Sequence, residues 1–155
     1  LVRAYDQGAV DAWTTDKSGL ASYLPTLQDP SAHAILEATI SKEPLAPAVL
    51  QGDSQWRDVI SWTLYGLFGA EEYGITSENV AEQAETSQIP DVQRLLGVEP
   101  ELGLEANAIY TAIEQVGNYG EIYDRNLGPD TQFNIPRGLN AQWSDGGLIY
   151  GMPFR

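Results

Sequence analysis

The sequence predicts a helix-rich α/β protein with only a few strands. Apolar side chains recur at helical spacing over residues 54–73, which is long enough for about five turns. Short apolar or β-branched runs at 9–15 and 33–40 lie between turn residues, as strands do. With 43% hydrophobic and only 19% charged residues, the chain has enough apolar material to form a core.

The N-terminal residues predict the order helix, strand, helix. Residues 2–8 have the pattern of the last turns of a helix that a glycine ends. Residues 9–15 are apolar or β-branched, so we expect a buried strand there. Residues 18–27 again carry apolar side chains at helical spacing, and either Asp16 or Ser18 can cap this helix.

The next stretch connects this region to the strongest helix. Residues 33–40 alternate weakly and predict a second strand. Pro44 and Pro47 stand three residues apart, which forbids a helix interior and predicts an extended crossover. The helix at 54–73 should then bury one face, which consists of Trp56, Val59, Ile60, Thr63, Leu64, Leu67 and Phe68.

The C-terminal half predicts more helix and an irregular tail. We expect a polar helix from Thr76 or Ser77 to about residue 86, a short helix over 90–97, and a long one over 104–123. Gly117 should kink or break the last of these, because glycine costs about 1 kcal/mol relative to alanine in a helix. Residues 127–155 hold five glycines and three prolines among large apolar side chains, so we expect a tail that wraps over another surface.

Charge and composition exclude several classes of function. The 22 acidic residues outnumber the 8 Lys and Arg residues and give a net charge of -14, which excludes a nucleic-acid surface as the leading idea. The chain has no cysteine, so a disulfide framework, a Cys-zinc site and a thiol nucleophile are excluded. Residues 1–6 show no signal-peptide pattern, and we expect the chain to be a piece of something longer.

Evidence for catalysis is weak throughout. His33 is the single imidazole, and we expect it to be an ordinary surface or turn residue. We expect surface charge to account for the paired carboxylates, which are Glu71 with Glu72, Glu99 with Glu101, and Glu121 with Asp124. No phosphate loop, zinc-helix motif or calcium loop is present. We therefore expect no enzyme, no metal site and no cofactor.

One stretch combines groups that suit a binding site. Thr14, Thr15 and Asp16 follow an apolar run and precede a helix, and ligands of α/β sheets sit where strands end near helix N-termini. The Asp16 carboxylate can pair with a ligand ammonium or simply cap the helix, and the local sequence favours neither reading. The two threonines are weaker candidates, since threonine is a normal strand residue.

Several separated stretches carry a family resemblance. The segments 5–21 (YDQGAVDAWTTDKSGLA), 40–47 (ISKEPLAP) and 52–56 (GDSQW) closely resemble the C-terminal half of periplasmic amino-acid-binding proteins of ABC transporters. The later segments 95–98, 115–123 and 137–140 are similar to the general L-amino-acid-binding subgroup. The match runs along essentially the whole chain.

The resemblance implies a type II periplasmic-binding-protein fold, in which two lobes enclose a ligand cleft. Residues 1–37 would end the second, ligand-binding lobe, and 38–50 would form the crossover between lobes. Residues 51–75 would return to the first lobe, and 76–155 would form a C-terminal helical extension with a wrapping tail. The N-terminal half of such a protein would be missing.

The resemblance also implies a function and partners. An L-amino acid would be captured for the membrane permease of an ABC transporter in the periplasm, with the signal peptide lying outside this chain. Asp16 would take the ligand ammonium, while the Arg and hydroxyl groups that hold the carboxylate would lie in parts that this chain does not contain. The chain alone should then bind weakly or not at all. Exposed sheet edges and apolar helix faces would favour a homodimer or a rearranged, helix-rich domain.

Two other function classes remain open from the sequence. A stand-alone acidic protein-interaction module would use the aromatic tail as its contact surface and need no small-molecule ligand. An acid–base hydrolase would need one essential carboxylate, and no residue is singled out for that role.

Overall fold

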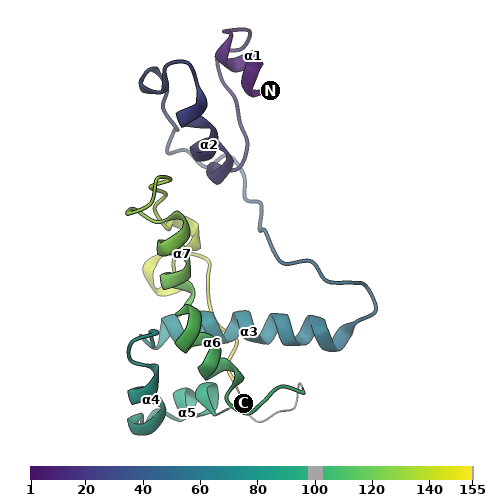
Figure 1. Cartoon of the computed structure of the whole chain (residues 1–155), viewed down its shortest axis with the longest axis vertical. Coiled ribbons are helices and arrows are strands. Elements are labelled where there is room, and N and C mark those ends of the chain that lie inside the picture. The colour runs from purple at the N-terminus through teal and green to yellow at the C-terminus, as the bar shows by residue number, and fades with distance from the viewer. Residues whose placement is uncertain (98–102, 155) are drawn as a thin grey trace. The chain divides into compact units, whose positions relative to one another are not determined.

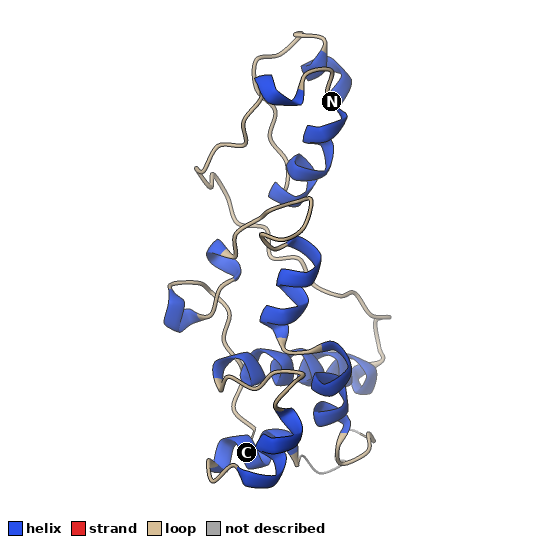
Figure 2. Cartoon of the chain, turned by 60° about the vertical axis from the view of Figure 1, so that its left-hand side comes forward, coloured by secondary structure: helices blue, strands red, loops and turns tan. Residues whose placement is uncertain are grey.

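The structure, a computed structural model, describes residues 1–97 and 103–154. It consists of helices connected by loops (Figure 2). These residues contain no strand, and their single β-bridge pairs Gln142 with Ile149. The helix-rich part of the predicted fold class is confirmed. The strands predicted at 9–15 and 33–40 are wrong, because the backbone there is extended or bent without pairing to a neighbouring segment, and pairing is what makes a strand.

The chain divides into two compact units. Unit 1 comprises Leu1–Ala46 with Leu127–Pro136, and unit 2 comprises Pro47–Asn126 with Arg137–Arg155. The assignment of residues 1–37, 38–50, 51–75 and 76–155 to parts of a two-lobed protein stays a prediction.

Unit 1 contains short helices joined by long loops. Helix α1 spans Val2–Asp6 and α2 spans Lys17–Tyr23, with 3-10 turns at Leu24–Thr26 and Pro30–Ala32. The α1 end is tied down by its side chains: the Tyr5 hydroxyl lies 2.7 Å from Nδ1 of His33, and the Asp6 carboxylate accepts the Gln28 N–H at 3.0 Å. The crossover is extended and largely exposed, as the two prolines predict.

Unit 2 is built on a long helix, α3, which spans Ser54–Glu72 (Figure 1). Its first turn is capped by Asp53, whose carboxylate accepts the Trp56 N–H at 2.9 Å. Helices α4 (Val80–Thr86), α5 (Pro90–Leu96) and α6 (Ala108–Val116) pack against one another, and both α5 and α6 contact α3. None of the described helices is long and apolar enough to cross a membrane.

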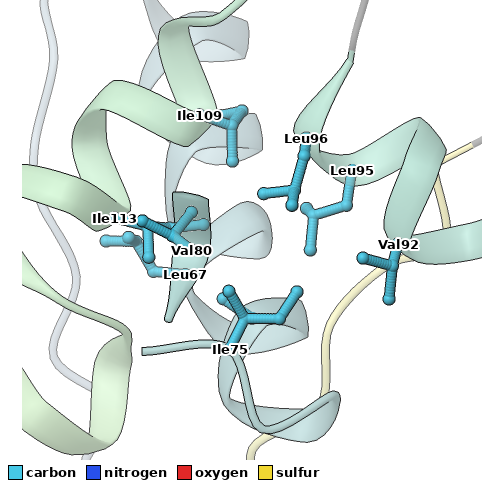
Figure 3. Packing of buried hydrophobic residues seen from close by; sticks show 9 residues of the cluster. Leu67, Ile75, Val80, Val92, Leu95, Leu96, Ile109 and Ile113 are labelled. Atoms are coloured by element: carbon cyan, nitrogen blue, oxygen red, sulfur yellow. The ribbon is translucent and has the colours of Figure 1, made fainter. Parts of the chain in front are cut away.

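The core of unit 2 lies between these four helices (Figure 3). It joins the second half of α3 to the loop after it, to α4 and α5, and to α6. Its buried members are Leu67, Ala70, Ile75, Val80, Val92, Leu95, Leu96, Ile109 and Ile113. The first half of α3 contributes less than its sequence predicts, since the Trp56 side chain remains 51% exposed.

The helix predicted over 104–123 is two helices. Helix α6 ends at Val116, Gly117 adopts a φ of +79°, and α7 begins at Tyr119 and runs to Leu127. Asn118 and Glu121 form a reciprocal cap, in which the Glu121 N–H donates to Oδ1 of Asn118 and the Asn118 N–H donates to Oε2 of Glu121, both at 2.9 Å. The break at Gly117 is therefore confirmed, and the cap makes it a new helix start.

Among the described residues after Arg137, the last ones pack on α3. Phe154 packs edge-on against Trp62 with ring centroids 5.2 Å apart, and its carbonyl accepts the Arg94 Nε–H. At Gly151 the tail passes so close to α3 that a Cβ there would lie 2.8 Å from the Gly69 nitrogen. Only glycine permits this approach.

Candidate functional site

Asp16 ends the extended segment of unit 1 and begins α2. Its backbone carbonyl accepts the Leu20 N–H at 2.9 Å, which starts the helix, but its side chain makes no capping hydrogen bond. The residue is exposed. The sequence left two roles open for the Asp16 carboxylate, capping α2 or pairing with a ligand ammonium. In the structure this carboxylate does not cap α2, so it is available to another partner.

The two threonines before Asp16 are exposed as well. A Cβ on Gly19 would lie 3.3 Å from Cγ2 of Thr15, so that threonine side chain packs over the first turn of α2. The structure thus brings Thr15 and Asp16 to the same end of the helix, as the sequence predicts. Neither of the two hollows described below, both on unit 2, is lined by these residues.

Trp13, which directly precedes Thr14, packs against the C-terminal end of α2. Its ring packs on Tyr23 with centroids 5.5 Å apart, while its Nε1–H is buried without a hydrogen-bond partner among the described groups. An unsatisfied buried donor costs about 1–3 kcal/mol, so this indole N–H is an unused hydrogen-bond donor in unit 1. Trp13 is not among the site residues that the sequence predicts.

Of the paired carboxylates that the structure describes, Glu71, Glu72 and Glu121 have structural partners and Asp124 is exposed. Glu71 forms an ion pair with Arg137 at 2.9 Å, and Glu72 accepts the Trp143 Nε1–H at 3.1 Å. Glu99 and Glu101 fall outside the described residues. His33 is held by Tyr5, as noted above. In the described part of the chain, no three His, Asp or Glu side chains come close enough together to hold a metal ion.

Among the residues that the structure describes, Glu121 is the carboxylate with the most hydrogen bonds. Besides the Asn118 N–H, it accepts the Ser77 hydroxyl at 2.6 Å and the Ser77 N–H at 3.1 Å. Partial burial acts to raise its pKa, but these donors outweigh burial and hold the pKa of Glu121 below its usual value of 4.5. This site ties α7 to the loop before α4 and has no open position for a ligand.

Arg137 occupies a cage that the sequence analysis missed. Its guanidinium binds both oxygens of Glu71, at 2.9 and 3.1 Å, and lies over the rings of Tyr119 and Tyr123 at 5.3 and 5.2 Å from their centroids. Burial raises the pKa of both tyrosines, against the opposing effect of the Arg137 charge. The relevant residues are far apart in sequence, so only the fold brings them together.

The chain matches known proteins along nearly its whole length. It is 51% identical over 98% of its length to the General L-amino acid-binding periplasmic protein AapJ of Rhizobium johnstonii. It is 48% identical over 96% of its length to the Glutamate/glutamine/aspartate/asparagine-binding protein BztA of Rhodobacter capsulatus. A putative amino-acid ABC transporter-binding protein of Escherichia coli, YhdW, is 40% identical over 99% of the chain. No protein-family model matches.

A solved structure matches as well. The ABC transporter periplasmic binding protein from Brucella ovis with glutathione bound aligns with a TM-score of 0.87 and 48% identity over 99% of this chain.

The matches cover only part of each relative. The chain spans 46% of the Rhizobium protein, 45% of the Rhodobacter protein and 50% of the Brucella chain, so it corresponds to about half the length of these relatives. This partial coverage is consistent with a match to the C-terminal part of such a protein. The names of these relatives describe binding proteins and not enzymes. The resemblance is confirmed: the chain is a homologue of the amino-acid-binding periplasmic proteins of ABC transporters and matches about half of their length.

Proposed function

We propose that this chain supplies part of the ligand site of a periplasmic amino-acid-binding protein that serves the permease of an ABC transporter. Asp16 holds the ammonium of an L-amino acid, and Thr14 and Thr15 add hydroxyl contacts. The observation that carries the proposal is the exposed Asp16 carboxylate, which begins a helix without capping it. The identities of 40–51% to amino-acid-binding proteins support the ligand class.

The same geometry explains why the chain by itself should bind weakly. An exposed ion pair contributes only about 0–1 kcal/mol, because water and salt screen it. A zwitterionic amino acid also needs donors for its carboxylate, usually an Arg fork with backbone N–H groups. We assign these donors to the half of the relatives with which this chain does not align. Enclosure between both halves would strengthen the pairing at Asp16.

Calorimetry on the 155-residue chain tests the first part of the proposal. Titrations with L-glutamate, L-glutamine, L-aspartate and L-asparagine should give no binding in the micromolar range. A micromolar dissociation constant for any of the four would show that the chain carries a complete site, and would refute the division of the site between two halves.

A chimaera tests the role of Asp16. This chain would replace the segment of the Rhizobium relative with which it aligns, and the product should bind L-amino acids. Asp16→Asn should weaken binding by about 2–5 kcal/mol, the usual cost of leaving a buried charge without its partner. Asp11→Asn changes another exposed acid of the same segment and should have no effect. Equal affinities of the two variants, with unchanged thermal unfolding, would remove Asp16 from the site.

Self-association of the isolated chain is part of the same proposal. Large apolar side chains along the crossover are exposed, including Ile40 at 79%, Leu45 at 79% and Leu50 at 81%. We propose that these side chains are covered in a homodimer. Sedimentation at about 50 µM should show the dimer even if its dissociation constant is only about 10 µM. A monomer at that concentration would contradict this.

The alternative of a stand-alone acidic interaction module is not favoured. It predicts no relationship to solute-binding proteins, whereas nearly the whole chain aligns with them. We place the protein in the periplasm by the same relationship. A thermal-shift screen of the chimaera with amino acids separates the two functions, since an interaction module would not respond to them.

A further inference from the structure

An open hollow on unit 2 lies well apart in sequence from the proposed amino-acid site. It has a volume of about 410 Å³ and is lined by Glu72, Trp143, Tyr150 and Gly151. The two aromatic side chains are unusually accessible for their size, with Trp143 58% and Tyr150 54% exposed. The Trp143 indole N–H donates to Oε1 of Glu72 at 3.1 Å, which holds that carboxylate beside the edge of the indole ring.

The protein itself shows what such a set of groups binds. One residue before Glu72, the Glu71 carboxylate and two tyrosine rings hold the guanidinium of Arg137. Cations are favoured over aromatic faces by about 0.5–1 kcal/mol at exposed sites, and a neighbouring carboxylate adds to this. The hollow repeats the combination of one carboxylate and two aromatic rings, but none of the ion pairs among the described residues involves Glu72.

Both the hollow, which contains the Glu72 carboxylate, and the chain as a whole carry negative charge, which favours a cationic partner. The chain carries 22 acidic residues against 8 Lys and Arg residues. A smaller cavity of about 130 Å³ adjoins the hollow, because Glu72 and Gly151 line both, and Asp91 and Tyr73 extend the lining on that side. Asp91 is already paired with Arg94 and accepts the Tyr73 hydroxyl, so Glu72 is the carboxylate of this lining without an ion pair.

The shape favours a polypeptide over a small solute. Sites for small molecules are usually enclosed and bury most of their ligand, whereas this hollow is open to solvent. A peptide can place one basic side chain against the exposed rings and continue into the adjoining cavity. We propose that the groove formed by Glu72, Trp143, Tyr150 and Gly151 docks an Arg- or Lys-bearing segment of a protein partner. This surface is additional to the amino-acid site.

Titration of the ¹⁵N-labelled chain tests the proposal. The probe is the peptide acetyl-Gly-Arg-Gly-Arg-Gly-amide, and its counterpart carries citrulline, which has the same shape without the charge. The arginine peptide should shift the Trp143 indole N–H resonance, which the variant Trp143→Phe identifies among the four tryptophans. The citrulline peptide and free L-arginine should leave the resonance unchanged at the same concentrations.

Variants and salt complete the test. Glu72→Gln and Tyr150→Ala should each weaken peptide binding about two- to fivefold, and 500 mM salt should weaken it further. Glu85→Gln removes the same charge from an exposed position on α4 and should not change binding. The proposal is wrong if the citrulline peptide binds equally, if free L-arginine binds as tightly as the peptide, or if Glu72→Gln behaves like Glu85→Gln while both variants unfold like the parent chain.

Discussion

The two units differ in what their side chains are used for. In unit 2 the core cluster joins four helices, and Ala70, Ile75 and Ile113 are completely buried. In unit 1 the buried apolar residues are only Ala21, Leu27 and Ile135 among those that the structure describes, and none of them is completely buried. Unit 2 is thus stabilised by the burial of its own apolar side chains. Unit 1 instead leaves a carboxylate, two hydroxyls and an indole N–H without internal partners.

This difference separates folding from binding in the chain. Groups that remain available for a ligand cannot also contribute contacts to a core. We therefore expect unit 1 to gain order when a ligand and the other half of a binding protein cover it, and unit 2 to remain folded without them.

Hydrogen exchange should show the largest contrast. Amides of α3 and α6 should exchange at least about a thousandfold more slowly than those at 9–15, because core helices open only with global unfolding and unpaired backbone is open already. Mass spectrometry of exchanged peptides measures both regions in one sample. Equal protection of the two regions would show that unit 1 is held by contacts of comparable strength.

Removing core volume should affect unit 2 strongly. Ile113→Ala leaves a cavity at a completely buried position and should lower the free energy of unfolding by about 2–5 kcal/mol. Val10→Ala in unit 1 should cost less than about 0.5 kcal/mol, since Val10 is 47% exposed. Urea unfolding followed by far-UV circular dichroism measures both variants. A larger loss for Val10→Ala would reverse the comparison.

The Arg137 cage should contribute to the free energy of unfolding by an amount between those of Ile113 and Val10. Side chains of Arg137 and Glu71 are only 20% and 17% exposed, so removing one charge leaves the other largely buried. Arg137→Met should cost about 2–3 kcal/mol, less than at a fully buried pair because some water reaches the site. The double variant with Glu71→Gln should lose less than the sum of the two single losses. Additive losses in urea unfolding would show that the pair does not act as a unit.

Glu121 should contribute less to the free energy of unfolding of unit 2, and its contribution should depend on pH. Because its pKa is lower in the folded state than in the unfolded chain, its stabilisation is present above the unfolded value and disappears as the pH falls through the folded one. Glu121→Gln should cost about 1–2 kcal/mol at pH 7 and progressively less below about pH 4. Glu82→Gln, at an exposed position of α4, is the matched control. A loss for Glu121→Gln that is constant from pH 7 to 3 would exclude the carboxylate as its source.

Local patterns in the sequence predicted the helices well and the strands badly. The apolar period predicted α3, and Pro90 with Gly97 bounded α5 within a residue. A strand is different, because it exists only where a partner backbone accepts its hydrogen bonds, and the described residues place none beside 9–15. The start of α7 had a signal that was not used: Asn118 and Glu121 stand three residues apart directly after Gly117.

The candidate site shows the same division. Thr14, Thr15 and Asp16 are neighbours in the chain, so sequence alone could propose them together. It could not decide whether Asp16 caps α2, since a capping residue and an uncapped one have the same local pattern. The Arg137 cage and the Glu72 groove were invisible, because their members are about 70 residues apart.

The sequence by itself determined the helices, the break at Gly117, the absence of helix around Pro44 and Pro47, and the kinship with amino-acid-binding proteins. These depend on residues close together in the chain, or on many matched positions along it. Only the tertiary structure decided which acidic residues are engaged: Glu71 with Arg137, Glu121 with Ser77, and Asp16 with no capping partner. The physical reason is that a charge takes its properties from the groups that folding brings within a few ångströms, and their distance along the chain does not reveal them.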